Sequence, residues 1–169
     1  MNFIELSKQR RSIRKFSDKK VSDELIEQLL ISAMAAPSAR NMQPWEFYVL
    51  KSVKKQNEIK SVSKNYDYNS TLSIVVCGNK QRTLTQNDND FWIQDCSAAI
   101  ENILLAATSL GLGAVWCGAF PVVERSEAIK KVLNVNDNIV PLAVIQLGYP
   151  AEEKDLRSQY NKEYIHVLE

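Results

Sequence analysis

A stretch of 22 residues without a charged side chain, from Asn102 to Val123, limits the folds open to this chain. A run of that length could span a membrane. It contains Gly111, Gly113 and Pro121, however, and it divides into a helix end, a glycine turn and a short strand. The sequence therefore predicts a buried segment of a water-soluble domain and no membrane span.

The helix that leads into this stretch is expected to run from Phe91 to Leu110 and to be the longest in the protein. Its apolar residues recur at helical spacing and then spread around the second half until little of it can face water. A helix that is apolar nearly all round packs on more than one side, and Gly111 is well placed to end it. We expect a central helix with more apolar surface than one side of a small sheet can cover, and therefore an obligate homodimer.

Shorter helices and strands are interspersed along the rest of the chain. Asn2 and Glu5 form a capping box that opens a short helix. Ser22 starts a second helix, with Met34 at the end of its apolar stripe and Pro37 as its stop. The other expected elements are helices at 53–62 and 122–133, strands at 45–50, 72–77, 114–117 and 139–147, and a polar loop at 79–90. Strands interspersed with helices around a central one indicate a layered α/β sandwich.

Length and composition indicate one ordinary globular domain. The chain has 169 residues, of which 45% are hydrophobic and 24% charged. Without repeats or a linker we expect a single domain over 1–169, in which 150–169 is a charged C-terminal tail with several apolar side chains to bury. The net charge of +1 gives no global field that would attract nucleic acid or an anionic membrane. Three cysteines without metal-ligand spacing, and an N-terminus without a secretory apolar core, predict a reducing, cytoplasmic compartment and no metal site.

A basic cluster lies between the first two predicted helices. Arg10, Arg11 and Arg14, together with the Ser12 hydroxyl, fall within five residues. Arginine gives bidentate, charge-assisted hydrogen bonds to phosphate and does not lose its proton. A phosphate or other oxyanion site is one interpretation, and a solvated basic loop is the other. Nothing elsewhere extends the cluster into a nucleic-acid surface.

The segment between the second helix and the first strand is bracketed by Pro37 and Pro44. It contains small residues and the amides Asn41 and Gln43. A stiff loop with exposed backbone and amide groups can contact the polar edge of a planar heterocycle. A tight helix-to-strand connection would have the same composition, so both interpretations remain open.

The glycines after the long helix do not form a dinucleotide fingerprint. Trp116 stands where the third glycine would belong, and Gly111 and Gly113 follow a helix instead of a strand. We expect glycine here to let a flat ligand approach the backbone instead. His166, the only histidine, lies near the C-terminus and gives little support to a nucleophilic triad.

Taken together and in order, these segments resemble the nitroreductase family of FMN-dependent oxidoreductases. The resemblance rests on its arginine–serine–arginine motif at 10–16, its proline–serine loop at 37–45, its glycine–leucine–glycine segment at 111–116 and its strand ending at 148–150. It covers roughly residues 3–157. It implies an α+β fold, a layered α/β/α sandwich with a mixed, mainly antiparallel sheet and a central long helix.

The resemblance also implies FMN sites at the interface of a homodimer. The proline–serine loop would come from the other subunit, and the tail 150–169 would pack on the partner. Arg10, Ser12 and Arg11 would face the phosphate and ribityl chain, Arg14 the pyrimidine edge, and Lys154 could substitute for Arg157. The implied cofactor-binding residues are Arg10, Arg11, Ser12, Arg14, Pro37, Ser38, Ala39, Asn41, Gln43, Trp116, Cys117, Gly118 and Arg157.

The implied activity is electron transfer from NAD(P)H through flavin N5 to a small organic acceptor, such as a nitroaromatic or a quinone, by a ping-pong mechanism. No side-chain nucleophile or base is needed, so the implied catalytic set is empty. A flavin-dependent dehalogenase or dehydrogenase, and a non-catalytic flavin-binding or storage protein, would share the same motifs. The segment from Leu50 to Leu72 is short where larger relatives carry extra helices, so the acceptor stays open.

Overall fold

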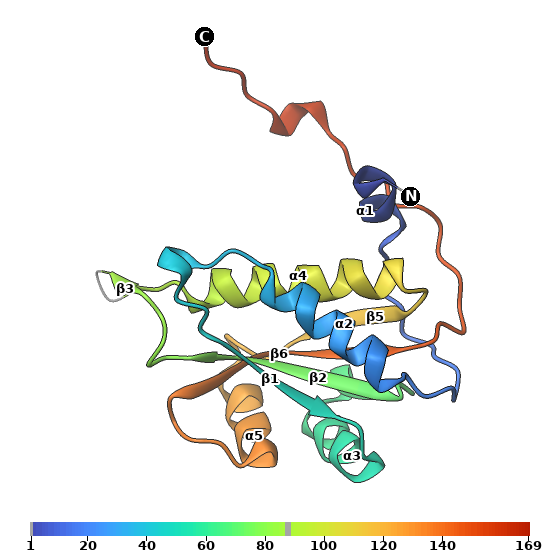
Figure 1. Cartoon of the computed structure of the whole chain (residues 1–169), viewed down its shortest axis with the longest axis vertical. Coiled ribbons are helices and arrows are strands. Elements are labelled where there is room, and N and C mark those ends of the chain that lie inside the picture. Colours follow the sequence, from blue (N-terminus) through green and yellow to red (C-terminus); the bar gives the residue numbers. More distant parts are fainter. Residues whose placement is uncertain (1, 87–88) are drawn as a thin grey trace.

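The computed structural model describes residues 2–86 and 89–169. The described residues form a four-stranded sheet in the order β1-β2-β6-β5, in which all three neighbouring pairs are antiparallel. Two helices, α2 and α4, cover one face of the sheet, and α3 and α5 cover the other (Figure 1).

The bounds of the strands are β1 Trp45–Leu50, β2 Leu72–Asn79, β5 Gly113–Gly118 and β6 Ile139–Gly148. Those of the helices are α1 Phe3–Gln9, α2 Asp23–Met34, α3 Val53–Val62, α4 Trp92–Ser109 and α5 Val123–Leu133. The predicted α+β sandwich is confirmed.

Local signals place the helix ends where the sequence predicts them. Asn2 and Glu5 form the capping box of α1, and the Ser22 hydroxyl accepts the Leu25 N–H at the start of α2. At the end of α4, Gly111 has φ +72°, its N–H donates to the Thr108 carbonyl, and the next N–H reaches back to the Ala107 carbonyl at 2.8 Å. This is a Schellman termination, which requires a left-handed residue at the position of the glycine.

The long helix α4 lies against the sheet in the larger of two cores. That core is shared by the sheet, α2 and α4, and the second core lies between the sheet, α3 and α5. One detail of α2 differs from the prediction, because the Met34 side chain is 53% exposed. The buried stripe of α2 runs through Ile26, Leu29 and Ala33, and one further residue turns Met34 about 100° away from it.

The polar segment 79–90 is mostly irregular, as predicted, but it also contains the two-residue strands β3 Thr85–Gln86 and β4 Asn89–Asp90. Residues 87–88, part of the same predicted loop, lie outside the described residues. In the part of the chain that the structure describes, no helix is long and apolar enough to cross a membrane.

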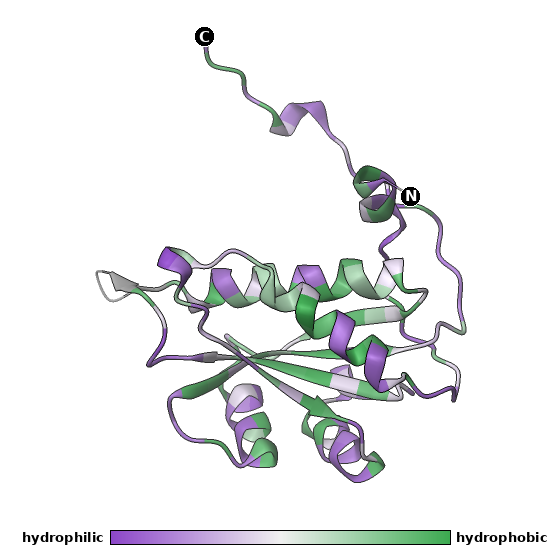
Figure 2. Cartoon of the chain, viewed as in Figure 1, coloured by the Kyte–Doolittle hydropathy of each residue, from purple (hydrophilic) through white to green (hydrophobic). Residues whose placement is uncertain are grey.

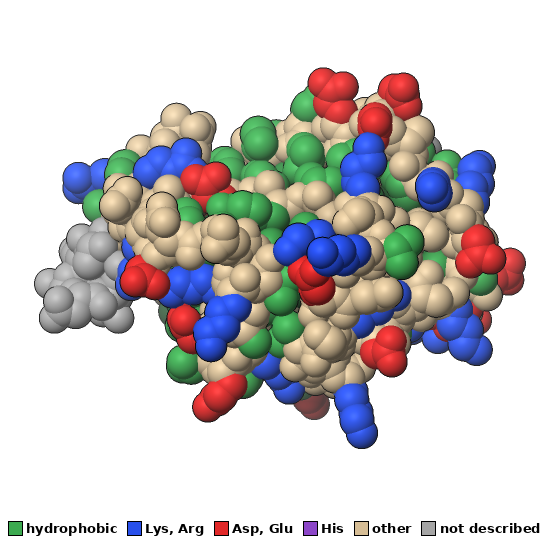
Figure 3. Space-filling model, turned by 90° about the horizontal axis from the view of Figure 1, so that it is seen from below, with side chains coloured by type: hydrophobic (Ala, Val, Ile, Leu, Met, Phe, Trp, Pro, Cys, Tyr) green, Lys and Arg blue, Asp and Glu red, His purple; other side chains and the backbone are tan. Residues whose placement is uncertain are grey.

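Both chain ends extend from one side of the body. The C-terminal tail runs past α1 and away from the sheet (Figure 1). Figure 2 shows that apolar and polar residues alternate along it, and Tyr160, Tyr164 and Leu168 are 74%, 81% and 94% exposed. The apolar residues of the tail are therefore not buried by the rest of this chain. On the opposite side of the molecule, the face with α3 and α5 carries intermingled acidic and basic side chains (Figure 3).

Candidate functional site

The basic segment after α1 runs along the outer edge of strand β5. Ser12 forms a parallel bridge with Ala114, and the Ile13 N–H donates to the Ala114 carbonyl at 3.0 Å. The close approach depends on Gly113, because a Cβ there would lie 2.7 Å from Ile13 Cγ2. The arginine–serine–arginine segment is thus docked on the sheet edge and is not a free loop.

Arg10 and Arg14 lie at the two ends of this docked segment. The Arg10 side chain is 17% exposed, and its Nε is 3.2 Å from a carboxylate oxygen of Glu101 on α4. Arg14 lies close enough to Cys117 on β5 for its charge to oppose the effect of burial, which raises the pKa of that thiol to about 11. The segment therefore presents two guanidiniums with a hydroxyl between them.

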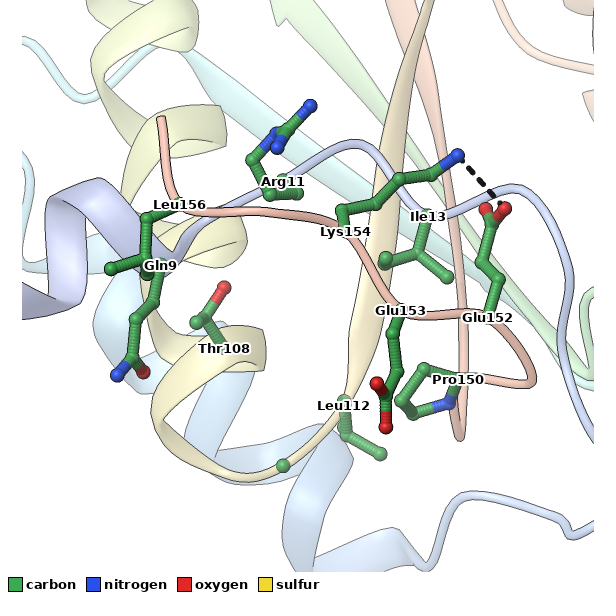
Figure 4. A pocket seen from close by; sticks show the side chains of 11 residues that line it. Gln9, Arg11, Ile13, Thr108, Leu112, Pro150, Glu152, Glu153, Lys154 and Leu156 are labelled. Atoms are coloured by element: carbon green, nitrogen blue, oxygen red, sulfur yellow. Dashed lines mark ion pairs between the residues drawn. The ribbon is translucent and has the colours of Figure 1, made fainter. Parts of the chain in front are cut away.

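Arg11 and the tail residues occupy a neighbouring but different place. Alternate residues Gln9, Arg11 and Ile13 line a cavity of about 570 Å³ at the end of α4, closed on its other side by residues 150–156 (Figure 4). The Arg11 guanidinium donates to the Asp155 carbonyl. The Arg157 N–H donates to the Lys8 carbonyl at 3.0 Å, while its side chain is exposed. The structure does not bring the Arg11 side chain together with those of Arg10 and Arg14.

The end of β5 offers an open surface beside Arg14. Side chains alternate between the faces of a strand, so Trp116 is 37% exposed while Cys117 is buried in the core under α3 and α5. A Cβ on Gly118 would meet no atom within 4 Å. This place combines an aromatic side chain, accessible backbone and a nearby positive charge, and it can accept a flat anionic molecule. The Cys117 thiol points away from it.

The loop between Pro37 and Pro44, which contains the 3₁₀ turn η1 Ala39–Asn41, is held in an uncommon conformation. Arg40, Asn41 and Gln43 have φ values of 48°, 57° and 49°. Left-handed residues other than glycine are rare and concentrate at functional sites.

Hydrogen bonds inside this loop and to α4 keep it in place. The Ser38 hydroxyl accepts the Gln43 N–H at 3.0 Å, and the Gln43 side-chain amide donates to the side-chain oxygen Oδ1 of Asn41 at 3.0 Å. The Ala39 N–H donates to the carboxylate of Asp95, which is 5% exposed. The proline–serine loop is therefore stiff and anchored at the start of α4.

The two halves of the predicted site lie at opposite edges of the sheet. The loop leads into β1, whereas the basic segment borders β5, and three strand spacings amount to about 14 Å. Figure 1 shows the loop and the segment after α1 on opposite sides of the body. One chain thus keeps the residues of the proline–serine loop apart from Ser12, Arg14, Trp116 and Gly118.

Three carboxylate side chains that make these contacts were not predicted as site residues from the sequence. Asp95 interrupts the apolar stripe of α4, and a buried acid in that pattern is a usable signal. Glu101 is the charged residue that immediately precedes the uncharged stretch. Glu152, which binds the Arg14 backbone, gives no local signal because its partner is 138 residues away.

Comparisons with known proteins identify the family of this chain. The sequence model described as "Nitroreductase family" matches residues 7–66 and 66–149. A protein of Archaeoglobus fulgidus named "Putative NADH dehydrogenase/NAD(P)H nitroreductase" is 45% identical over 165 residues, 93% of this chain and 92% of that protein. The solved structure of an FMN-dependent nitroreductase from Clostridium difficile R20291 is 30% identical in sequence and superposes with a TM-score of 0.87. The match covers 98% of this chain and 98% of that chain. The NADPH-flavin oxidoreductase of Vibrio harveyi is 28% identical over 92% of this chain and 69% of that protein. Because the family model matches nearly the whole body and a relative is 45% identical over 93% of the chain, this chain belongs to the nitroreductase family.

Proposed function

We propose that this protein is an FMN-dependent NAD(P)H oxidoreductase that passes electrons to a small organic acceptor such as a nitroaromatic or a quinone. The observation that carries the proposal is the β5 edge, where Trp116 is exposed, the backbone at Gly118 is open, and the charge of Arg14 reaches Cys117 between them. Family membership supports the same activity, since relatives bear the names FMN-dependent nitroreductase and NADPH-flavin oxidoreductase. The three cysteines are free and buried, and we include a cytoplasmic location in the proposal.

The residues at the β5 edge fit FMN in shape and charge. Arg10 uses one donor toward Glu101, and a guanidinium has five N–H groups, so others are available to a phosphate. The space above Gly118 would be filled by a Cβ and is instead open to a ring. In the proposed assignment Arg10 and Ser12 hold the phosphate, Arg14 lies at the pyrimidine edge, and Trp116 and Gly118 border the ring.

The reaction requires little chemistry from the side chains. When bound, FMN accepts a hydride at N5 and returns electrons to a second substrate in turn, which gives ping-pong kinetics. The chain contributes orientation and a positive charge. Cys117 cannot act as a nucleophile at neutral pH, because burial raises its pKa to about 11 and its side chain points into the core.

We further propose that each site is completed by a second copy of the chain. The stiff loop with Pro37, Ser38, Ala39, Asn41 and Gln43 lies at the far edge of the sheet from Arg14. A homodimer with FMN at the interface brings the loop of one chain to the β5 edge of its partner. The exposed apolar side chains of the tail 150–169 would then pack on the partner.

The test combines a visible spectrum with steady-state kinetics. We expect the purified protein to be yellow, or to become yellow with FMN, and to release the flavin on denaturation. It should oxidise NADH or NADPH in the presence of a nitroaromatic or a quinone. Absence of a flavin band after incubation with excess FMN would refute the proposal. Bound FMN without NAD(P)H oxidation would indicate a storage protein instead of an enzyme.

A further inference from the structure

Glu152, in the C-terminal tail, contacts the backbone of the basic segment. Its carboxylate accepts the N–H of Arg14 at 2.6 Å, a short and charge-assisted hydrogen bond. Its other oxygen is 3.0 Å from Lys154 Nζ, and the Glu152 side chain is 14% exposed. Figure 4 shows this ion pair beside Ile13 at the rim of the cavity.

The Glu152 carboxylate remains ionised at neutral pH. The backbone N–H of Arg14 and the charge of Lys154 both lower its pKa. The hydrogen bond to Arg14 is therefore one to a charged acceptor, which is stronger than a neutral one.

Backbone contacts hold the chain in place around Glu152. Phe16 bridges Pro150, the Ala151 N–H donates to the Lys15 carbonyl at 2.9 Å, and the Ser17 N–H donates to the Tyr149 carbonyl at 2.9 Å. The start of the tail is thus paired, through backbone hydrogen bonds, with the segment that follows the basic cluster. The Glu152 side chain extends this pairing by one residue, to the backbone of Arg14.

The charged end of Arg14 is unsupported in the described part of the chain, and Glu152 contacts only its backbone. Within residues 2–86 and 89–169, no carboxylate pairs with the Arg14 guanidinium, and the residue is exposed. A long side chain without a partner keeps its position only if its backbone is fixed. The backbone N–H that Glu152 accepts is the point at which the tail acts on Arg14.

We propose that Glu152 is a positioning residue for Arg14, so that the start of the C-terminal tail sets both the affinity for FMN and the potential of the bound flavin. This inference rests on the proposed FMN site. In the assignment above, Glu152 does not contact the flavin. The inference therefore adds a residue outside the FMN site to those that set the potential of the flavin.

The direction of the potential shift separates positioning from simple electrostatics. Removing a nearby negative charge would by itself favour the reduced flavin and raise the potential. Loss of a well-placed Arg14 guanidinium would lower it. We therefore expect Glu152→Ala to lower the potential and to weaken FMN binding about tenfold, because a displaced Arg14 loses its charge-assisted contact with the flavin.

The experiment compares Glu152→Ala, Glu152→Gln and the matched control Glu153→Ala by FMN titration and spectroscopic redox titration. Glu153 is the adjacent, exposed residue with the same charge. Glu153→Ala should behave as the parent protein. Glu152→Gln keeps an acceptor for the Arg14 N–H and should recover most of the affinity. If the parent and the control fail to bind FMN, the proposed function is wrong.

If both bind FMN but Glu152→Ala has a potential equal to or above that of Glu153→Ala, the positioning role is wrong. A Gln variant no better than the Ala variant would also overturn it. In an Arg14→Met background, Glu152→Ala should no longer lower the potential, because only the direct effect of the removed charge remains. An equal shift in both backgrounds would show that Glu152 does not act through Arg14.

Discussion

Arg14 and Arg10 carry the same charge, yet their places in the proposed site predict different effects. At about 4 Å and an effective dielectric near 20, a charge pair is worth about 4 kcal/mol, and solvent screening leaves about 1–3 kcal/mol. At about 30 mV per 1.4 kcal/mol, Arg14→Met should lower the two-electron midpoint potential by about 20–65 mV. The sign follows because reduction adds negative charge near N1, which the guanidinium stabilises.

Arg10→Met supplies the contrast at the other end of the segment. It should weaken FMN retention with little change in potential, because a phosphate keeps its charge throughout the redox cycle. Redox titration of both FMN-loaded variants against the parent protein checks the pair. An Arg14→Met protein that holds FMN with an unchanged or higher potential would contradict the assignment of Arg14 to the pyrimidine edge.

The buried thiols predict how stability depends on pH. Burial raises the pKa of Cys117 to about 11 and that of Cys96 to about 12, and it raises that of Cys77 as well. A thiol in the unfolded chain titrates near about 8.5. Between these values the unfolded chain loses protons that the folded protein keeps, so each thiol lowers the free energy of unfolding by about 1.4 kcal/mol per pH unit.

We therefore expect urea unfolding to show falling stability as the pH rises above about 8.5. Cys96→Ala should reduce the slope of the free energy of unfolding against pH by the contribution of one thiol, about 1.4 kcal/mol per pH unit. This change in slope is separate from any effect of the substitution on the stability at neutral pH. Equal slopes for the variant and the parent protein would show that the Cys96 thiol ionises in the folded state.

Among the elements, strand β2 packs closely against the start of helix α4, where Gly78 contacts the Trp92 side chain. A Cβ on Gly78 would lie 2.3 Å from Trp92 Cε3, and Trp92 is itself fixed by an edge-on contact with Phe120 at 5.2 Å. Gly78→Ala should therefore lower the free energy of unfolding by about 1–3 kcal/mol, as overpacking does elsewhere. Gly118→Ala, in strand β5 with no atom within 4 Å of the added methyl, should stay within about 0.5 kcal/mol. Equal losses for the two variants in urea denaturation would contradict this packing argument.

At the scale of the whole molecule, a single chain leaves large apolar side chains in water. Phe3 and Ile4 on α1 are 69% and 66% exposed, and Ile31 on α2 is 62% exposed. Exposed apolar surface of this extent typically marks an interface. We expect a homodimer at low micromolar concentration, and sedimentation showing a folded, FMN-loaded monomer would be decisive against it.

Complementation between two defective chains tests whether the sites are shared. Arg10→Met damages the β5 edge, and Asn41→Ala damages the loop at the opposite edge. A heterodimer of the two variants should contain one intact site and one doubly damaged site, so FMN should return to about half occupancy. If each site were built from one chain alone, both sites of the heterodimer would stay defective and no flavin would return.

Much of the fold follows from local patterns in the sequence. The Asn2 capping box, the Ser22 cap and the left-handed Gly111 act over three to five residues, so their signals are complete within the segments they control. The apolar helix 92–109 follows from helical periodicity, and the four main strands follow from short runs of apolar, β-branched and aromatic residues. The motifs also identified the segments of the candidate site, although not which of their side chains meet.

Tertiary structure decided which side chains share a place, because strand order and register join residues that are far apart in the chain. The β5 pleat turns Cys117 into the core while Trp116 stays exposed. Docking along β5 lets Arg11 face the cavity and leaves Arg14 near Cys117. Glu152 meets the Arg14 backbone across 138 residues, a contact that exists only because the tail runs beside the segment after α1. Local signals determine the elements of this protein, and long-range pairing determines the site.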